Sequence, residues 1–179
     1  MNKAPSPTTA SLAAALLVAA LAACGDAPAP SKAPAGATGA LAGIVVRGKS
    51  DGLPVAEAKR RTAAGQDIAI VGRIGGSEEP FAGDRAVFTV VDLSLKSCAR
   101  MDDPDHCATP WDYCCEDRRA LREGTATIEI AGADGRPLAG SVRGTAGLDP
   151  LAVVTVVGTV TDRNDKGLLV VRAKRIEVH

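Results

Sequence analysis

The sequence predicts a mainly β fold, a small Greek-key barrel of about five to six strands with one short helix. Two observations predict it. Several short segments alternate apolar and polar residues, which is the period of a strand with one buried face. The chain also contains 19 glycines, several of them inside or beside these segments, where strands bend sharply or bulge. With 46% hydrophobic residues, the chain is too apolar to be disordered, so we expect one packed domain.

The expected elements follow one another from residue 43 onward. Pro54 opens a short helix over residues 55–61, because proline is well tolerated where a helix begins, and Gly65 ends the pattern. Asp134 and Gly135 are a turn signal, so residues 138–143 should pair back across that turn. The candidate strand segments, of which five or six would form the barrel, are residues 43–47, 67–74, 86–92, 125–131, 138–143, 151–161 and 168–178.

The last two predicted strands contain signs of irregular pairing. Gly158 lies inside the Val-rich segment 151–161, where a glycine indicates a bulge or a sharp coil. In segment 168–178 the apolar side changes between Ala173 and Ile176, as it would if the strand contained one extra residue. We therefore expect bulges in this final pair of strands.

Parts of these segments resemble a known fold family. Residues 67–76 (DIAIVGRIGG) and 86–92 (AVFTVVD) are similar to the first two strands of OB-fold domains of the anticodon-binding type. Residues 156–160 and 168–173 resemble the closing hairpin of that fold. The resemblance implies an OB-like barrel within residues 41–179, and it raises nucleic-acid binding as one hypothesis.

Composition argues against that hypothesis. Arg73 and Thr89 stand on the presumed binding strands with no aromatic residue beside them. Trp, Tyr and Phe together make up only four of the 179 residues, and 21 basic residues balance 21 acidic ones. A single-stranded nucleic acid needs stacking platforms and a basic surface, so we expect nucleic acid not to be the partner.

The first 40 residues read as an export signal and a tether. Residues 1–23 combine Lys3 with an apolar run over residues 12–23, which is shorter than a membrane-spanning helix. The sequence Leu-Ala-Ala-Cys ending at Cys24 resembles the lipobox of bacterial lipoproteins, which implies that Cys24 becomes the mature N-terminus and carries lipid such as palmitate. Residues 24–40 are rich in Ala and Pro and read as a flexible tether. The alternative is an ordinary secretory signal with a chance cysteine.

These features predict a protein of the bacterial cell envelope. A lipid on Cys24 would anchor the chain to a membrane, with the folded part facing the periplasm or the exterior. The expected partners are the membrane itself and an envelope protein or a small ligand.

Residues 94–124 form an insertion between two predicted strands, and its cysteines allow three readings. Four cysteines in an oxidising compartment favour two disulfides, although a bridge between the adjacent Cys114 and Cys115 would be strained. A zinc or copper site is the second reading, although the spacing C-x8-C-x6-C-C is not that of paired zinc knuckles. Thiol redox exchange is the third reading. The candidate disulfide or metal residues are Cys98, His106, Cys107, Cys114 and Cys115.

The neighbouring aromatic residues and the missing motifs complete the functional prediction. Trp111, Asp112 and Tyr113 form either a small core for the insertion or an exposed rim that grips a ligand. The chain has no G-x-S-x-G nucleophile motif, no phosphate-binding loop and no C-x2-C-H haem motif. The sequence therefore favours a non-catalytic binding module stapled by disulfides, with a metal-binding or thiol-redox protein as the alternative.

Overall fold

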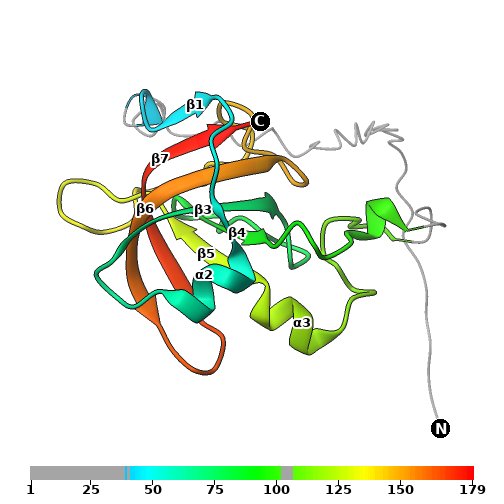
Figure 1. Ribbon diagram of the computed structural model, residues 1–179. Helices are drawn as coiled ribbons and strands as arrows, with labels where there is room; N and C mark the ends of the chain where they lie inside the picture. The colour runs from blue at the N-terminus through cyan, green and yellow to red at the C-terminus, as the bar shows by residue number, and fades with distance from the viewer. Residues whose placement is uncertain (1–38, 40, 102–106) are drawn as a thin grey trace, which may run out of the picture. The chain divides into compact units, whose positions relative to one another are not determined.

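The computed structural model describes residue 39 and residues 41–101 and 107–179 (Figure 1). The predicted signal, the lipidation site Cys24 and the greater part of the tether lie outside these residues, as does His106. The elements in chain order are β1 (Val45–Arg47), β2 (Leu53–Pro54), α2 (Val55–Arg61), β3 (Asp67–Ile74), β4 (Val87–Val91), the 3-10 turn η1 (Cys98–Arg100), α3 (Arg118–Glu123), β5 (Thr125–Glu129), β6 (Val153–Arg163) and β7 (Leu169–Val178).

Five of the strands close into a barrel, as the sequence predicts. Around the ring, β3 pairs with β4, β4 with β5, β5 with β7, β7 with β6, and β6 returns to β3. The β5–β7 pairing is parallel and the other four are antiparallel, which gives an OB-like Greek-key barrel. Outside the ring, β1 extends β7 and β2 extends β3, each in parallel.

The barrel interior is filled by branched aliphatic side chains from alternating strand positions. On β3, Ile68, Ile70 and Ile74 point inward, and the buried Gly72 continues this alternation. The residues at the other positions of the strand are more exposed. Helix α2 adds Val55 and Ala58, both fully buried, to the same core. Its bounds match the predicted helix, with Pro54 at the N-terminal end where its missing N–H costs least.

The predicted bulge in β7 is confirmed. Val157 pairs with Arg175 and Gly158 pairs with Ala173, so Lys174 is the extra residue. A side chain on Gly158 would overlap the carbonyl oxygen of Arg172, which explains the glycine inside β6. At this bulge the outer edge of β7 changes its partner from β5 to β1.

The predicted strand over residues 138–143 was wrong. This segment makes one isolated bridge, from Ala139 to Arg85, and Pro137 just before it makes another, across the turn to Ala131. Pro137 has no N–H to donate, and Gly140 has a φ of 89°, so a regular ladder ends at once. Leu138 instead donates its N–H to Ile130 (2.9 Å) and accepts the N–H of Ala86 (2.8 Å), filling the gap between two strand ends.

Helix α3 was not predicted. Its N-cap is Asp117, whose side chain accepts the backbone N–H groups of Arg119 and Ala120. All six of its residues after this cap, Arg-Arg-Ala-Leu-Arg-Glu, are strong helix formers, which is a visible helix signal. Across the parts of the chain that the structure describes, no helix is both long and apolar enough to span a membrane.

Candidate metal centre

The cysteine-bearing segment leaves the barrel after β4 and returns to it at β5; residues 93–123 are called the Cys loop below. Its base is closed by a hydrogen bond from the N–H of Asp92 to the carbonyl of Gly124 (2.8 Å). The buried Asp92 carboxylate accepts the N–H groups of Ala56 in α2 (2.9 Å) and Ser94 (3.0 Å). The loop therefore starts and ends at one point on the barrel, and that point is also tied to α2.

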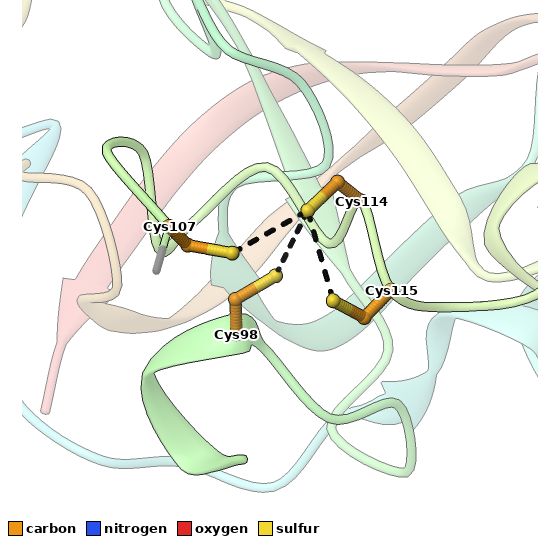
Figure 2. A group of neighbouring side chains, drawn as sticks. All are labelled: Cys98, Cys107, Cys114 and Cys115. Carbon is orange, nitrogen blue, oxygen red and sulfur yellow. Dashed lines mark hydrogen bonds between the residues drawn. The ribbon is translucent and has the colours of Figure 1, made fainter. Parts of the chain in front are cut away.

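The four cysteines of the Cys loop bring their sulfur atoms together (Figure 2). Cys114 occupies the middle, with its Sγ 3.5 Å from that of Cys98, 3.5 Å from that of Cys107 and 3.8 Å from that of Cys115. All four Sγ atoms lie within 4.8 Å of one another. They come from three parts of the loop, namely η1, the stretch after residue 106 and the Cys114–Cys115 pair.

These separations suit a shared ion better than a covalent bridge. A disulfide needs its two sulfurs at about 2.05 Å, and the four described cysteines are free thiols. Four sulfurs around a tetrahedral zinc at about 2.3 Å would stand about 3.8 Å apart along each edge. The group could therefore hold a metal ion if the 3.5 Å pairs moved slightly apart and the wider pairs, which reach at most 4.8 Å, moved closer.

The disulfide staple favoured by the sequence is thus not formed among the described residues. Cys114 and Cys115 both turn their thiols toward the group, although they are adjacent in the chain (Figure 2). Tyr113, just before this pair, has a φ of 61°, a conformation that non-glycine residues adopt rarely. That backbone turn precedes the two adjacent thiols that converge on one centre.

A glycine pair after β3 forms the seat of the Cys loop. Gly76 donates its N–H to the carbonyl of Trp111 (2.9 Å). A Cβ on Gly75 would lie 2.5 Å from that same carbonyl oxygen and 3.0 Å from the Tyr113 ring, so a larger residue would push the loop away. The fully buried Tyr113 fills this contact, while Trp111 and Asp112 keep part of their surface exposed.

Asp112 organises the loop next to the sulfurs. One carboxylate oxygen accepts the N–H of Cys114 (2.8 Å) and contacts the Cys98 thiol (3.5 Å). The other accepts the hydroxyl of Thr109 (2.9 Å). Burial opposes the charge on Asp112, but these donors outweigh it and lower the pKa of its carboxyl below the ordinary value. Asp112 therefore positions the ligand-bearing backbone as a charged acceptor.

The thiols influence one another's protonation. Burial opposes ionisation of Cys98, yet the backbone N–H of Cys115 and the neighbouring thiols lower the pKa of Cys98. The hydrogen bond with Cys114 favours the thiolate of Cys107, but Cys98 and burial outweigh it and raise the pKa of Cys107. Hydrogen bonds to Cys98 and Cys107 raise the pKa of Cys114 far above its ordinary value. Ionisation is therefore easiest at Cys98, and the coupling among the thiols opposes further negative charges unless a cation balances them.

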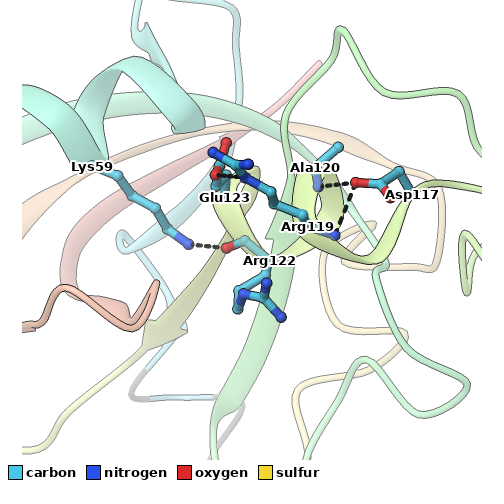
Figure 3. A network of polar contacts seen from close by, with 6 residues as sticks. All are labelled: Lys59, Asp117, Arg119, Ala120, Arg122 and Glu123. Carbon is cyan, nitrogen blue, oxygen red and sulfur yellow. Dashed lines mark hydrogen bonds and ion pairs between the residues drawn. The ribbon is translucent and has the colours of Figure 1, made fainter.

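Helix α3 follows the Cys114–Cys115 pair in the chain. Polar contacts fix this helix at both ends (Figure 3). Asp117 caps its N-terminus, and Arg119 pairs with Glu123 along its surface (2.9 Å). At the C-terminal end, the buried Lys59 of α2 donates to the carbonyls of Arg122 (2.7 Å) and Gly167 (2.6 Å). Burial lowers the pKa of Lys59 to about 8, with Glu123 opposing the shift. Lys59 thus links α2, α3 and the β6–β7 turn.

The sequence identified the four cysteines but not the residues that bring them together. Asp112 was expected only as part of a small core or a possible rim. Gly75 and Gly76 were noted only as the end of the OB-like segment 67–76. The Asp-x-Cys spacing of an Asx turn, in which the side chain bonds the N–H two residues on, was the signal for Asp112.

No protein-family model matches this chain, and no curated protein matches it. An account of its function therefore depends on the chemistry of the site rather than on the fold.

Proposed function

We propose that this is a lipid-anchored protein of the bacterial cell envelope whose barrel carries one exchangeable metal ion on Cys98, Cys107, Cys114 and Cys115. The observation that supports this most directly is the convergence of all four Sγ atoms within 4.8 Å. Two disulfides would require only pairwise contacts, whereas Cys114 has three sulfur neighbours at similar distances.

Zinc is the ion that this donor set favours. A tetrahedral set of four sulfurs is typical of zinc or an iron–sulfur centre, and soft thiolates also suit cuprous copper. Four thiolates around a divalent ion leave a formal charge of minus two. The backbone N–H of Cys115, which lowers the pKa of Cys98, helps to balance that charge.

The ion would be exchangeable because the barrel does not depend on the centre. The main hydrophobic core contains none of the four cysteines, although Cys98 itself is buried. Cys114 and Cys115 are exposed, and Cys107 is partly exposed. A structural zinc site is normally closed and contributes to folding, whereas this one lies on a loop outside a complete core. Carrying or exchanging a metal fits that position better than stabilising the fold.

The lipid anchor rests on Cys24 and its lipobox-like context. The Ala/Pro-rich segment that follows would act as the tether between the membrane and the barrel. The parent chain should incorporate labelled palmitate, and replacing Cys24 with Ser should abolish that incorporation. A parent chain that takes up no palmitate would contradict the anchor.

The metal proposal is tested on the Cys24→Ser chain, which retains only the four loop cysteines. The chain is purified without oxygen and titrated with Co²⁺ and Zn²⁺. We expect one ion per chain, with the intense visible absorption of a tetrahedral cobalt–thiolate centre. Cys98→Ser and Cys114→Ser should each abolish that spectrum while leaving the far-UV circular dichroism unchanged.

The same preparation distinguishes the disulfide-stapled binding module. Two disulfides would lower the mass of the unreduced, envelope-exported chain by four hydrogens and leave no titratable thiols. That mass, combined with failure to bind cobalt after reduction, would overturn the metal proposal.

A further inference from the structure

A cleft of about 520 Å³ opens beside Cys114, within the size range of small-molecule sites. Tyr113 and Cys114 line it from the Cys loop, and Arg118, Leu121 and Arg122 line it from α3. The cleft thus joins an exposed thiol of the metal centre to a wall that carries two guanidinium groups.

The two arginines of this wall are available to a ligand. Arg118 and Arg122 are exposed and stand one helical turn apart; within the described residues neither side chain makes an ion pair or a hydrogen bond. Arg119 on the same helix is different, because it pairs with Glu123 (2.9 Å). Glu116 also lines the cleft, but its carboxylate accepts the N–H of Lys96 (2.6 Å). Guanidinium groups with free donors bind carboxylates well.

The thiol in the cleft is the sulfur that contacts the other three. Cys114 lines the cleft, while Cys98, Cys107 and Cys115 do not. Its Sγ is the shared neighbour of the other sulfurs, at 3.5, 3.5 and 3.8 Å. A molecule seated against the arginines can therefore approach the exposed Cys114, the ligand that lines the cleft, first.

We infer that the cleft binds a small thiol that carries carboxylate groups, and that such a thiol removes the metal ion from the centre by replacing Cys114. This inference rests on the proposed metal-binding function. The carboxylates bind to Arg118 and Arg122, Leu121 contacts the short carbon chain, and the sulfur is the soft donor that a thiolate-bound ion accepts.

The exchange step is a ligand substitution without oxidation or reduction. The sulfur of the incoming thiol bonds to the divalent ion, and the bond from the ion to Cys114 Sγ breaks. The proton of the incoming thiol ends on Cys114. Repetition at the remaining sulfurs, with further thiol, frees the ion as a small anionic thiolate complex.

The test uses the zinc-loaded Cys24→Ser chain and measures zinc release with a chromogenic chelator. Three thiols are compared at equal thiolate concentration: mercaptosuccinate with two carboxylates, uncharged 2-mercaptoethanol, and cationic cysteamine. Mercaptosuccinate should reach half-maximal release at about a tenfold lower concentration than 2-mercaptoethanol, because charge-assisted hydrogen bonds contribute at an exposed site. Succinate, which lacks sulfur, should inhibit the reaction of mercaptosuccinate and leave that of 2-mercaptoethanol unchanged.

The variant Arg118→Gln/Arg122→Gln should raise the half-saturating concentration of mercaptosuccinate about tenfold without changing release by 2-mercaptoethanol. Arg119→Gln removes one positive charge from the same helix and is the matched control, which should behave like the parent chain. Comparing each thiol between parent and variant cancels its intrinsic nucleophilicity.

Failure of the cleft inference and failure of the proposed metal-binding function give different results. If zinc binds but the three thiols release it equally, or the double variant changes nothing, the cleft inference is overturned and the metal centre stands. If the reduced chain binds neither zinc nor cobalt, the proposed function fails, and the cleft inference fails with it.

Discussion

The barrel and the Cys loop are held together by different forces. The barrel buries branched aliphatic side chains in a continuous core, from Val55 in α2 to Val178 at the end of β7. The Cys loop is attached mainly by hydrogen bonds at a few points: Asp92 to Gly124 at its base, Gly76 to Trp111 at its seat, and the buried Tyr113 between them. Changes in the barrel should therefore affect folding, whereas changes in the loop should affect metal binding.

The largest expected effect is on the barrel, at the bulge between β6 and β7. Gly158→Ala places a Cβ against the carbonyl of Arg172, so a strand must shift. We expect a loss of about 3 kcal/mol or more in the free energy of unfolding, measured by urea denaturation of the reduced chain. Gly83→Ala is the control, since its Cβ meets nothing within 4 Å, and it should change stability by less than about 0.5 kcal/mol. Equal effects of the two substitutions would refute the close approach.

The second prediction concerns the pH dependence of stability that Lys59, the buried lysine joining α2 to α3, confers on the fold. The pKa of Lys59 is about 8 in the folded chain and ordinary, 10.5, in the unfolded chain. Between these pH values the unfolded chain holds more protons, so the stability contributed by Lys59 rises as the pH rises. Relative to Lys59→Met, the parent chain should gain about 1 to 3 kcal/mol between pH 8 and 10.5. A difference in unfolding free energy that stays flat or falls over this range would contradict the lowered pKa.

The third effect belongs to the loop alone. Asp112→Ala removes the acceptor of the Cys114 N–H and the Thr109 hydroxyl. We expect the affinity for Co²⁺ to fall about 10- to 100-fold, as for other residues that orient metal ligands. Asp112→Asn keeps an acceptor oxygen and should restore most of the affinity. A large drop in barrel stability without a change in affinity would mean that the loop and barrel are not separate.

The smallest effect concerns the half-exposed Trp111. Its Nε1 donates to the carbonyl of Glu78 (2.9 Å), and Arg143 lies over its ring at 5.9 Å. Trp111→Phe loses the hydrogen bond and keeps an aromatic ring, so it should cost about 0.5 to 1 kcal/mol. Circular dichroism is the appropriate probe, because Trp111 is the only tryptophan. A cost above about 2 kcal/mol would place Trp111 in the barrel core.

The barrel could be predicted because its signals are local. The alternation on β3, Pro54 before α2, and the change of apolar side near Lys174 each lie within a few residues. The segment over residues 138–143 misled because the turn signal at Asp134 and Gly135 suggested a returning strand, which Pro137 and Gly140 prevent.

From the sequence, the candidate metal centre could be predicted only as a group of possible ligand residues. The spacing of the cysteines does not determine whether their sulfurs converge. Convergence here accompanies the φ of 61° at Tyr113 and the seat at Gly75 and Gly76, more than 30 residues earlier in the chain. Such contacts between distant segments leave no periodic pattern in the sequence.

The pairing of β1 with β7 also determines when the domain can finish folding. Val45 lies opposite Ile176, 131 positions later, and Asp67 in β3 lies opposite Thr159 in β6, 92 positions later. Neither pairing can form until β6 and β7 have been synthesised, and closing such long loops costs entropy before contacts compensate for it. We therefore expect the barrel to fold only once β7 is available, on the millisecond-to-second scale of proteins dominated by non-local strand pairing.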